Sequence, residues 1–222
     1  LGTSPIQNRH RTMTTLREIL RTATNAADFA RAYTAYVSEL LARLDADAVA
    51  DFIQELERAR DERHTVFLAG NGGSASTAAH MANDFSFGVQ SKPSEQSLNV
   101  HCLTDNVPVL TAIANDLSYS EVFVRQLEMC FRPGDRLVVL SASGNSDNIV
   151  NAAAWVKSHG GVVIGLIGFD GGALKAHCDV LIHVRTPKGE YGPVEDLHLV
   201  INHLATLWMQ SRVRPGMGTT TA

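Results

Sequence analysis

The chain has 222 residues, of which 45% are hydrophobic and 19% are charged, an ordinary balance for a globular protein. Its formal net charge of −4 argues against a nucleic-acid-binding surface spread over the domain. No apolar run approaches the roughly 20 residues needed to span a bilayer, and the N-terminal residues do not resemble a signal peptide. The three cysteines lack metal-ligand spacing, so we expect reduced thiols in a cytoplasmic protein without nucleic-acid or membrane partners.

The N-terminal part precedes any strand. Residues 1–27 are predicted to be a lead that is partly disordered. Apolar residues at helical spacing then predict two helices, over 28–44 and 46–60. Their apolar faces include Tyr33, Tyr36, Leu40, Phe52 and Leu56. These faces need a partner, either the sheet or another subunit, and because one small sheet offers limited cover we expect an oligomer.

From residue 63 onward, short apolar runs alternate with helical patterns. The runs predict strands at 65–69, 98–103, 136–140, 161–167 and 180–184. The helices are expected around His80 and at 107–115, 121–130, 147–158, 171–176 and 194–212, with loops at 90–96 and 186–193. This alternation predicts an α/β fold with a doubly wound, five-stranded parallel sheet. We predict one domain over 1–222: the lead, the N-terminal helices (28–62), the sheet core with the final helix (63–212) and a loose tail (213–222).

A glycine turn follows the first predicted strand. Gly70-Asn71-Gly72-Gly73 turns sharply, and Ser74 is expected to be the N-cap of the next helix. Free N–H groups at a helix N-terminus favour an anion. The turn also fits the dinucleotide pattern G-x-G-x-x-A, but that site needs an acidic residue about 20 positions on, and Asp105 lies well beyond. Phosphate binding is therefore favoured over a nicotinamide cofactor.

A second loop of similar composition follows the third predicted strand. Ser141, Ser143 and Ser146 provide three hydroxyls within six residues. Together with loop N–H groups, they can surround a phosphate without Lys or Arg. The alternative is that the serines only cap the following helix. One cap needs one serine, so phosphate binding is favoured.

The helix after the glycine turn places His80 and Asp84 at i, i+4, on one face. The pair suits a metal site or acid–base chemistry. A surface ion pair is the alternative.

The GNGGS turn after one strand and the SxSGNS loop after another resemble the SIS domain family, over about residues 28–210. Within it the chain is most similar to the bacterial phosphoheptose isomerases, also through its segments TDNVPVLTAIAND (104–116) and EDLHLVINHL (195–204). The resemblance implies a flavodoxin-like fold. It also implies interconversion of sedoheptulose 7-phosphate and D-glycero-D-manno-heptose 7-phosphate, a homotetramer, and zinc at the active site.

The resemblance also implies roles for individual residues. It makes Asp84 and His203 catalytic, as a base and its acid–base partner. It implies that zinc binds His80, Asp84, Glu195 and His203. The implied substrate-binding residues are Asn71, Gly72, Gly73, Ser74, Asp105, Asn115, Asp116, Ser141, Ala142, Ser143, Ser146 and Glu195. The family has Glu where this chain has Asp84, Gln at Glu195 and Thr at Ala142, which leaves the choice of sugar open.

Two alternatives remain at this point. One is a non-catalytic SIS module that binds a sugar phosphate or a protein partner, like the family branch that is a tetrameric scaffold for the bacterial replication initiator. That branch lacks the helix carboxylate, so Asp84 favours an enzyme. The second concerns the metal: Glu195 and His203 lie roughly 12 Å apart along one helix, at 1.5 Å per residue. Both side chains must reach inward, or the site is shared between subunits.

Overall fold

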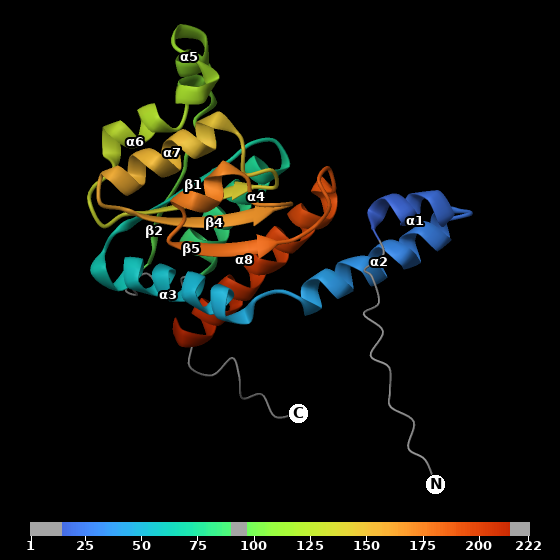
Figure 1. The fold of residues 1–222 in the computed structure, drawn as a ribbon. Helices are drawn as coiled ribbons and strands as arrows, with labels where there is room; N and C mark the ends of the chain where they lie inside the picture. The colour runs from blue at the N-terminus through green and yellow to red at the C-terminus, as the bar shows by residue number, and fades with distance from the viewer. Residues whose placement is uncertain (1–14, 90–96, 214–222) are drawn as a thin grey trace.

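The computed structural model describes residues 15–89 and 97–213, arranged around a five-stranded parallel sheet (Figure 1). The strand order is β2-β1-β3-β4-β5. The strands are β1 (Thr65–Gly70), β2 (Asn99–Cys102), β3 (Arg136–Ser141), β4 (Val162–Gly168) and β5 (Val180–Val184). All neighbours pair in parallel, which confirms the predicted doubly wound sheet. The ends of the predicted strands lie within one residue of these bounds, and those of β5 coincide with the prediction.

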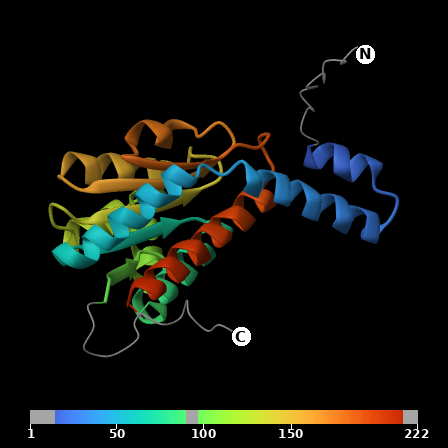
Figure 2. The same cartoon turned by 90° about the horizontal axis from the view of Figure 1, so that it is seen from below.

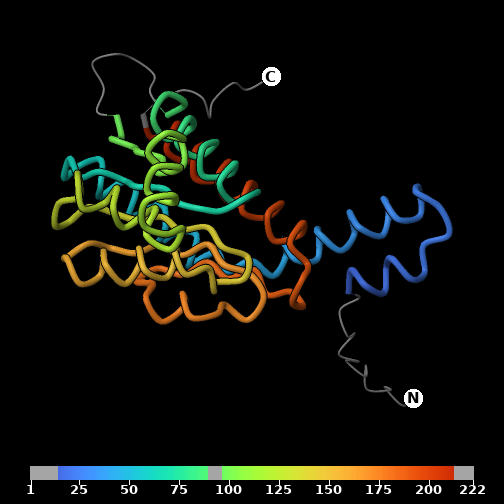
Figure 3. Tube along the Cα trace, turned by 90° about the horizontal axis from the view of Figure 1, so that it is seen from above, coloured from blue at the N-terminus to red at the C-terminus, as the bar shows by residue number. Residues whose placement is uncertain are grey.

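Helices cover both faces of the sheet. They are α1 (Leu16–Thr22), α2 (Ala26–Ala42), α3 (Ala46–Glu62), α4 (Gly73–Asn83), α5 (Val107–Asp116), α6 (Val124–Cys130), α7 (Asp147–Ser158) and α8 (Tyr191–Val213). Three short turns of other helical types are η1 (Asp84–Gly88), η2 (Tyr119–Glu121) and η3 (Ala173–His177). One core cluster joins α3, α4 and α8 to the sheet, and the second joins α6 and α7 to the opposite face (Figures 1 and 3).

Two helix predictions need correction. The predicted lead contains α1, so three helices rather than two precede the sheet. The sequence feature that marks the start of α1 is a capping box. The Thr15 side chain accepts a hydrogen bond from the backbone N–H of Glu18, and the Glu18 side chain accepts one from the backbone N–H of Thr15. The final helix begins at Tyr191, inside the loop predicted for 186–193, because Pro193 is tolerated in the first turn of a helix. The predictions for residues 1–12, 90–96 and 214–222 lie outside the described residues.

The apolar faces of the N-terminal helices are mostly covered within the chain. Phe52 and Leu56 of α3 are fully buried in the core beneath the sheet, and Tyr36 and Leu40 of α2 pack with residues of α8. Of the two partners left open by the sequence, the sheet and α8 therefore cover these four side chains, and the oligomeric state remains a prediction. Figures 1 and 2 show that α1 and the first half of α2 nevertheless project beyond the sheet. Among the described residues, no helix is long and apolar enough to cross a bilayer.

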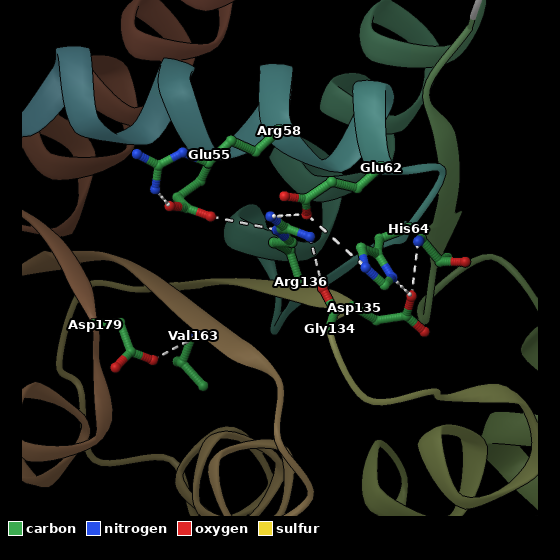
Figure 4. Close-up of polar contacts among 10 residues, drawn as sticks. Glu55, Arg58, Glu62, His64, Gly134, Asp135, Arg136, Val163 and Asp179 are labelled. Atoms are coloured by element: carbon green, nitrogen blue, oxygen red, sulfur yellow. Dashed lines mark hydrogen bonds and ion pairs between the residues drawn. The ribbon is translucent and has the colours of Figure 1, made fainter.

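Charged side chains gather where β1 and β3 begin, at the edge of the sheet away from the glycine and serine loops (Figure 4). The Arg136 side chain is only 5% exposed and pairs with Glu55 at 3.3 Å and with Glu62 at 2.9 Å. Its Nη1 also donates to the carbonyl of Gly134. Because these contacts satisfy a nearly buried guanidinium, the cluster has a structural role.

Asp135 in the same region should be important for stability. Its carboxylate accepts hydrogen bonds from the N–H groups of Thr65 and Arg132, both at 2.8 Å, and the residue is 2% exposed. Asp135→Ala leaves two donors without their partner, so the free energy of unfolding should fall by about 2–4 kcal/mol. Urea denaturation measures this change.

Asp179→Ala is the matched control. Asp179 likewise accepts from a strand N–H group, that of Val163 at 3.0 Å, but its side chain is 37% exposed (Figure 4). Water can replace it, so the loss should be about 1 kcal/mol or less. Equal losses in the two variants would contradict the importance of burial.

Candidate functional site

The two predicted loops lie side by side at the carboxyl ends of β1 and β3. These strands are neighbours, with Gly70 opposite Leu140, and the chain order of the sheet reverses between them. Ligands bind at such switch points in open α/β sheets. A cavity of about 290 Å³ lies between the loops. Its lining residues are Asn71, Gly72, Gly73, Ser74, Leu140, Ser141, Ala142, Ser143, Ser146, Tyr191 and Glu195. We call it the serine cavity.

In the second loop, the hydroxyls of Ser141 and Ser143 accept hydrogen bonds, so their own hydrogens remain available for a ligand. Ser141 Oγ accepts from the N–H of Gly144 at 3.0 Å, and Ser143 Oγ accepts from the N–H of Asn145 at 3.3 Å. Each hydroxyl can therefore still donate. Ser146 is the N-cap residue of α7, but its side chain makes no capping hydrogen bond. The alternative that these serines only cap a helix therefore loses support.

The glycine turn differs from its prediction by two residues. The N-cap of α4 is Gly72, with φ of +54°, and not Ser74. Glycine adopts this conformation without steric cost, so the helix begins at Gly73. Ser74 lies in the first turn, is almost fully buried and lines the serine cavity. A Cβ at Gly73 would meet the carboxylate of Glu195, so a larger residue there would require the Glu195 side chain to shift.

Glu195 reaches the serine cavity from the first turns of α8. Its position against Gly73 places it at the start of α4. Burial, and secondly the charge of Asp196, raise the pKa of Glu195 above its ordinary value. A carboxylate here opposes a bound anion while it is ionised.

A second group of side chains lies where α4 ends. His80 Nε2 is 3.3 Å from Asp84 Oδ2, and His203 Nε2 is 4.0 Å from the same oxygen. One ligand atom from each residue lies within 4.8 Å of the other two. Asp84 begins the π-helical turn η1, a distortion that occurs frequently at functional sites. We call these three residues the His–Asp group.

Asn202 supports the His–Asp group and was missed from the sequence. Its Nδ2 donates to Asp84 Oδ2 at 2.7 Å, and the residue is fully buried. Its spacing could have predicted that it lies near the site, since Asn202 comes two helical turns after Glu195 and directly before His203. Such a bond fixes which way the carboxylate of Asp84 faces.

The His–Asp group has the donors for a metal ion. Two imidazoles and one carboxylate match the three protein ligands of catalytic zinc sites, which keep a position open for substrate. The side chains of His80 and His203 are 44% and 51% exposed, so a substrate can approach. A surface ion pair explains the His80–Asp84 distance equally well, but it does not explain His203 beside both.

The serine cavity and the His–Asp group lie at successive positions along two neighbouring helices. Helix α4 runs beside α8 (Figure 3). Gly73 lies near Glu195, and Asp84, which directly follows α4, is bonded to Asn202. Glu195 and His203 are eight residues apart, roughly 12 Å along α8. The structure therefore does not include Glu195 in the His–Asp group, and the predicted four-residue metal set remains a prediction.

Three predicted substrate residues lie elsewhere. Asp105, Asn115 and Asp116 are exposed, and none of them lines the serine cavity. The physical reason is the position of α5, which stands away from the sheet and has no buried residue (Figure 1). Within one described chain, these side chains are not gathered with the other site residues.

His198 has a different role from its neighbours on α8. It is fully buried, and burial lowers its pKa to about 4 despite the opposing effect of the Ile167 carbonyl. A neutral, enclosed imidazole fits the structural interpretation of this residue.

Comparisons with known proteins agree with this arrangement. The family model described as "SIS domain" matches residues 28–168. A phosphoheptose isomerase of Chlorobaculum tepidum is 36% identical, over 78% of this chain and 82% of that protein. A phosphoheptose isomerase of Aneurinibacillus thermoaerophilus is 40% identical over 63% of this chain and 68% of its own. The solved phosphoheptose isomerase of Neisseria gonorrhoeae superposes with a TM-score of 0.75 at 25% identity, covering 84% of this chain and 100% of that chain.

Proposed function

The chain belongs to the SIS domain family and, within it, to the phosphoheptose isomerases, and from this membership we infer that it is a sugar-phosphate isomerase. We propose that it interconverts sedoheptulose 7-phosphate and D-glycero-D-manno-heptose 7-phosphate. The observation that supports this most is the placement of the serine cavity and the His–Asp group along the same two helices. Glu195 at the serine cavity and His203 in the His–Asp group are eight residues apart on α8, roughly 12 Å along the helix, so one extended substrate can lie along this helix.

The proposed chemistry moves a proton between adjacent carbons through an enediol. The serine cavity holds the phosphate with hydroxyls and the first-turn N–H groups of α4 and α7. Binding there positions the distant reacting carbons. Asp84 takes the carbon-bound proton, and His203 exchanges a proton at the oxygen end of the enediol. Asn202 keeps Asp84 facing the two histidines.

We propose that the metal is zinc, held by His80, Asp84 and His203, with Glu195 as a fourth ligand only if its side chain moves away from Gly73. When bound, a divalent ion stabilises the negative charge that develops on the substrate oxygen. Carboxylate and imidazole ligands also admit manganese or iron.

The non-catalytic alternative, a binding module or scaffold, is not favoured. Asp84 is retained and lies with both histidines, so the groups needed for proton transfer are assembled. The test is isomerisation of sedoheptulose 7-phosphate by the purified chain with added zinc. Turnover supports the proposal. Tight binding of the sugar phosphate without any turnover would favour the binding module instead.

Asn202→Ala should weaken the His–Asp group without removing any of its members. Loss of a side chain that orients a metal ligand typically costs about 10- to 100-fold in metal affinity or activity, and we expect a decrease of that size in both zinc affinity and kcat. Competition with a chromogenic chelator measures the affinity. Thr206→Val, one turn further along α8, is the control, since the Thr206 hydroxyl makes no hydrogen bond within the described part of the chain. An unchanged zinc affinity in Asn202→Ala would contradict the role given to Asn202.

We also propose a homotetramer, for a reason different from the sequence argument. Among the described residues, Leu20, Phe87, Leu207 and Trp208 are large apolar side chains with 44–78% exposure. A second copy covering them would remove this surface from water. Light scattering at micromolar concentration should report four copies, and a monomer would contradict the proposal. Cytoplasmic location remains a prediction, consistent with three free cysteines.

A further inference from the structure

Three side chains join the two loops of the serine cavity: Asn71, which lines it, and Asn148 and Tyr119, which lie outside its lining. Asn71, in the glycine turn, donates from Nδ2 to Asn148 Oδ1 at 2.9 Å, and Asn148 Nδ2 donates back to Asn71 Oδ1 at 2.9 Å. The hydroxyl of Tyr119 donates to the same Asn71 Oδ1 at 2.8 Å. Asn148 lies in the first turn of α7 and is almost fully buried. The pair therefore connects the turn that begins α4 to the turn that begins α7.

These bonds determine how the amide of Asn71 can be used. Its oxygen accepts two hydrogen bonds, the usual number for a carbonyl oxygen, and one of its two N–H bonds is taken by Asn148. Only the remaining N–H is left for a ligand in the serine cavity, which Asn71 lines. Rotation of the amide would break bonds to both partners, so the direction of this N–H is fixed.

The dependence on direction is strong here because no Lys or Arg lines the serine cavity. Neutral donors lose strength steeply when the distance or angle to the acceptor changes. A phosphate held only by hydroxyls and N–H groups therefore depends on the spacing between the two loops.

We propose that Tyr119, with Asn148, is a positioning residue for phosphate binding, a role that rests on the sugar-phosphate isomerase proposed above. Tyr119 comes from η2, directly after α5, and is 57% exposed. It fixes the oxygen of Asn71 and thereby aims the remaining N–H into the serine cavity. The segment containing α5, which contributes no residue to the lining of that cavity, acts on it through this one hydroxyl.

Tyr119→Phe tests this role, since it removes only the hydroxyl of a half-exposed side chain. The dissociation constant for inorganic phosphate, measured by calorimetry, should rise roughly 3- to 10-fold, the loss expected for one hydrogen bond. KM for sedoheptulose 7-phosphate should rise by a similar factor with little change in kcat, because the reacting carbons lie at the other end of the substrate. In an Asn71→Ala background, Tyr119→Phe should have no further effect.

Asn151→Ala is the matched control. Asn151 Nδ2 donates to the carbonyl of Ser120 at 3.4 Å, so it also joins α7 to η2, but it does not contact Asn71. Phosphate affinity in this variant should equal that of the wild type. The inference is overturned if Tyr119→Phe binds phosphate as tightly as the wild type, if Asn151→Ala weakens binding equally, or if Tyr119→Phe keeps its full effect without Asn71. Phosphate binding needs no turnover, so a chain that isomerises no sugar phosphate would contradict the proposed function alone.

Discussion

Asp84→Asn should lower kcat by about 10²- to 10⁴-fold, the contribution typical of a positioned general base. The amide keeps the size of the side chain and can still bond Asn202 by turning its oxygen toward Nδ2. It cannot accept a carbon-bound proton. The serine cavity does not include Asp84, so the dissociation constant for inorganic phosphate should stay at the wild-type value. Steady-state kinetics and calorimetry measure the two quantities separately.

Asp84→Glu should retain activity or raise it, because it restores the carboxylate of the family at a reach longer by one methylene. A displacement of about 1 Å can change a rate on the order of a hundredfold, so the direction of this change reports how the substrate sits. Asp51→Asn, on the exposed face of α3, is the control for loss of a carboxylate and should leave kcat unchanged. Turnover of Asp84→Asn at the wild-type rate would show that Asp84 is not the base.

Ser143→Ala combined with Ser146→Ala should weaken sugar-phosphate binding on the order of 10²- to 10⁴-fold. Each hydroxyl is expected to donate to a charged oxygen, a bond worth about 1.5–3 kcal/mol. No cationic side chain lines the serine cavity to compensate for their loss. Inorganic phosphate should lose affinity by the same factor, which calorimetry can measure without turnover.

Ser158→Ala is the control for the serine pair. Ser158 is the last residue of α7, the helix whose N-cap is Ser146. Its hydroxyl donates to the carbonyl of Trp155 at 2.7 Å. It should leave phosphate affinity unchanged. Unchanged affinity in the Ser143 and Ser146 double variant would remove the serine cavity as the phosphate site.

The sequence predicted the sheet and its two loops well, because both signals are local. A strand buried on both faces is nearly continuously apolar, so the runs at 136–140 and 161–167, which became β3 and β4, were recognisable from composition. The loops were recognisable because a sharp turn needs glycine and an uncharged anion site needs hydroxyls. The i, i+4 spacing of His80 and Asp84 gave their common face, since helical geometry fixes it.

What the sequence could not determine depends on contacts between distant segments. The bond from Asn202 to Asp84 joins residues 118 positions apart, and the bond from Tyr119 to Asn71 joins residues 48 apart. Neither residue has a local pattern that marks it. The family resemblance assigned Glu195 to both the substrate and the metal, but the packing of α8 along α4 places its carboxylate at the serine cavity. Glu195 and His203 lie roughly 12 Å apart along α8, so the packing of α8 against α4 decided that Glu195 lies beside Gly73 and His203 beside Asp84.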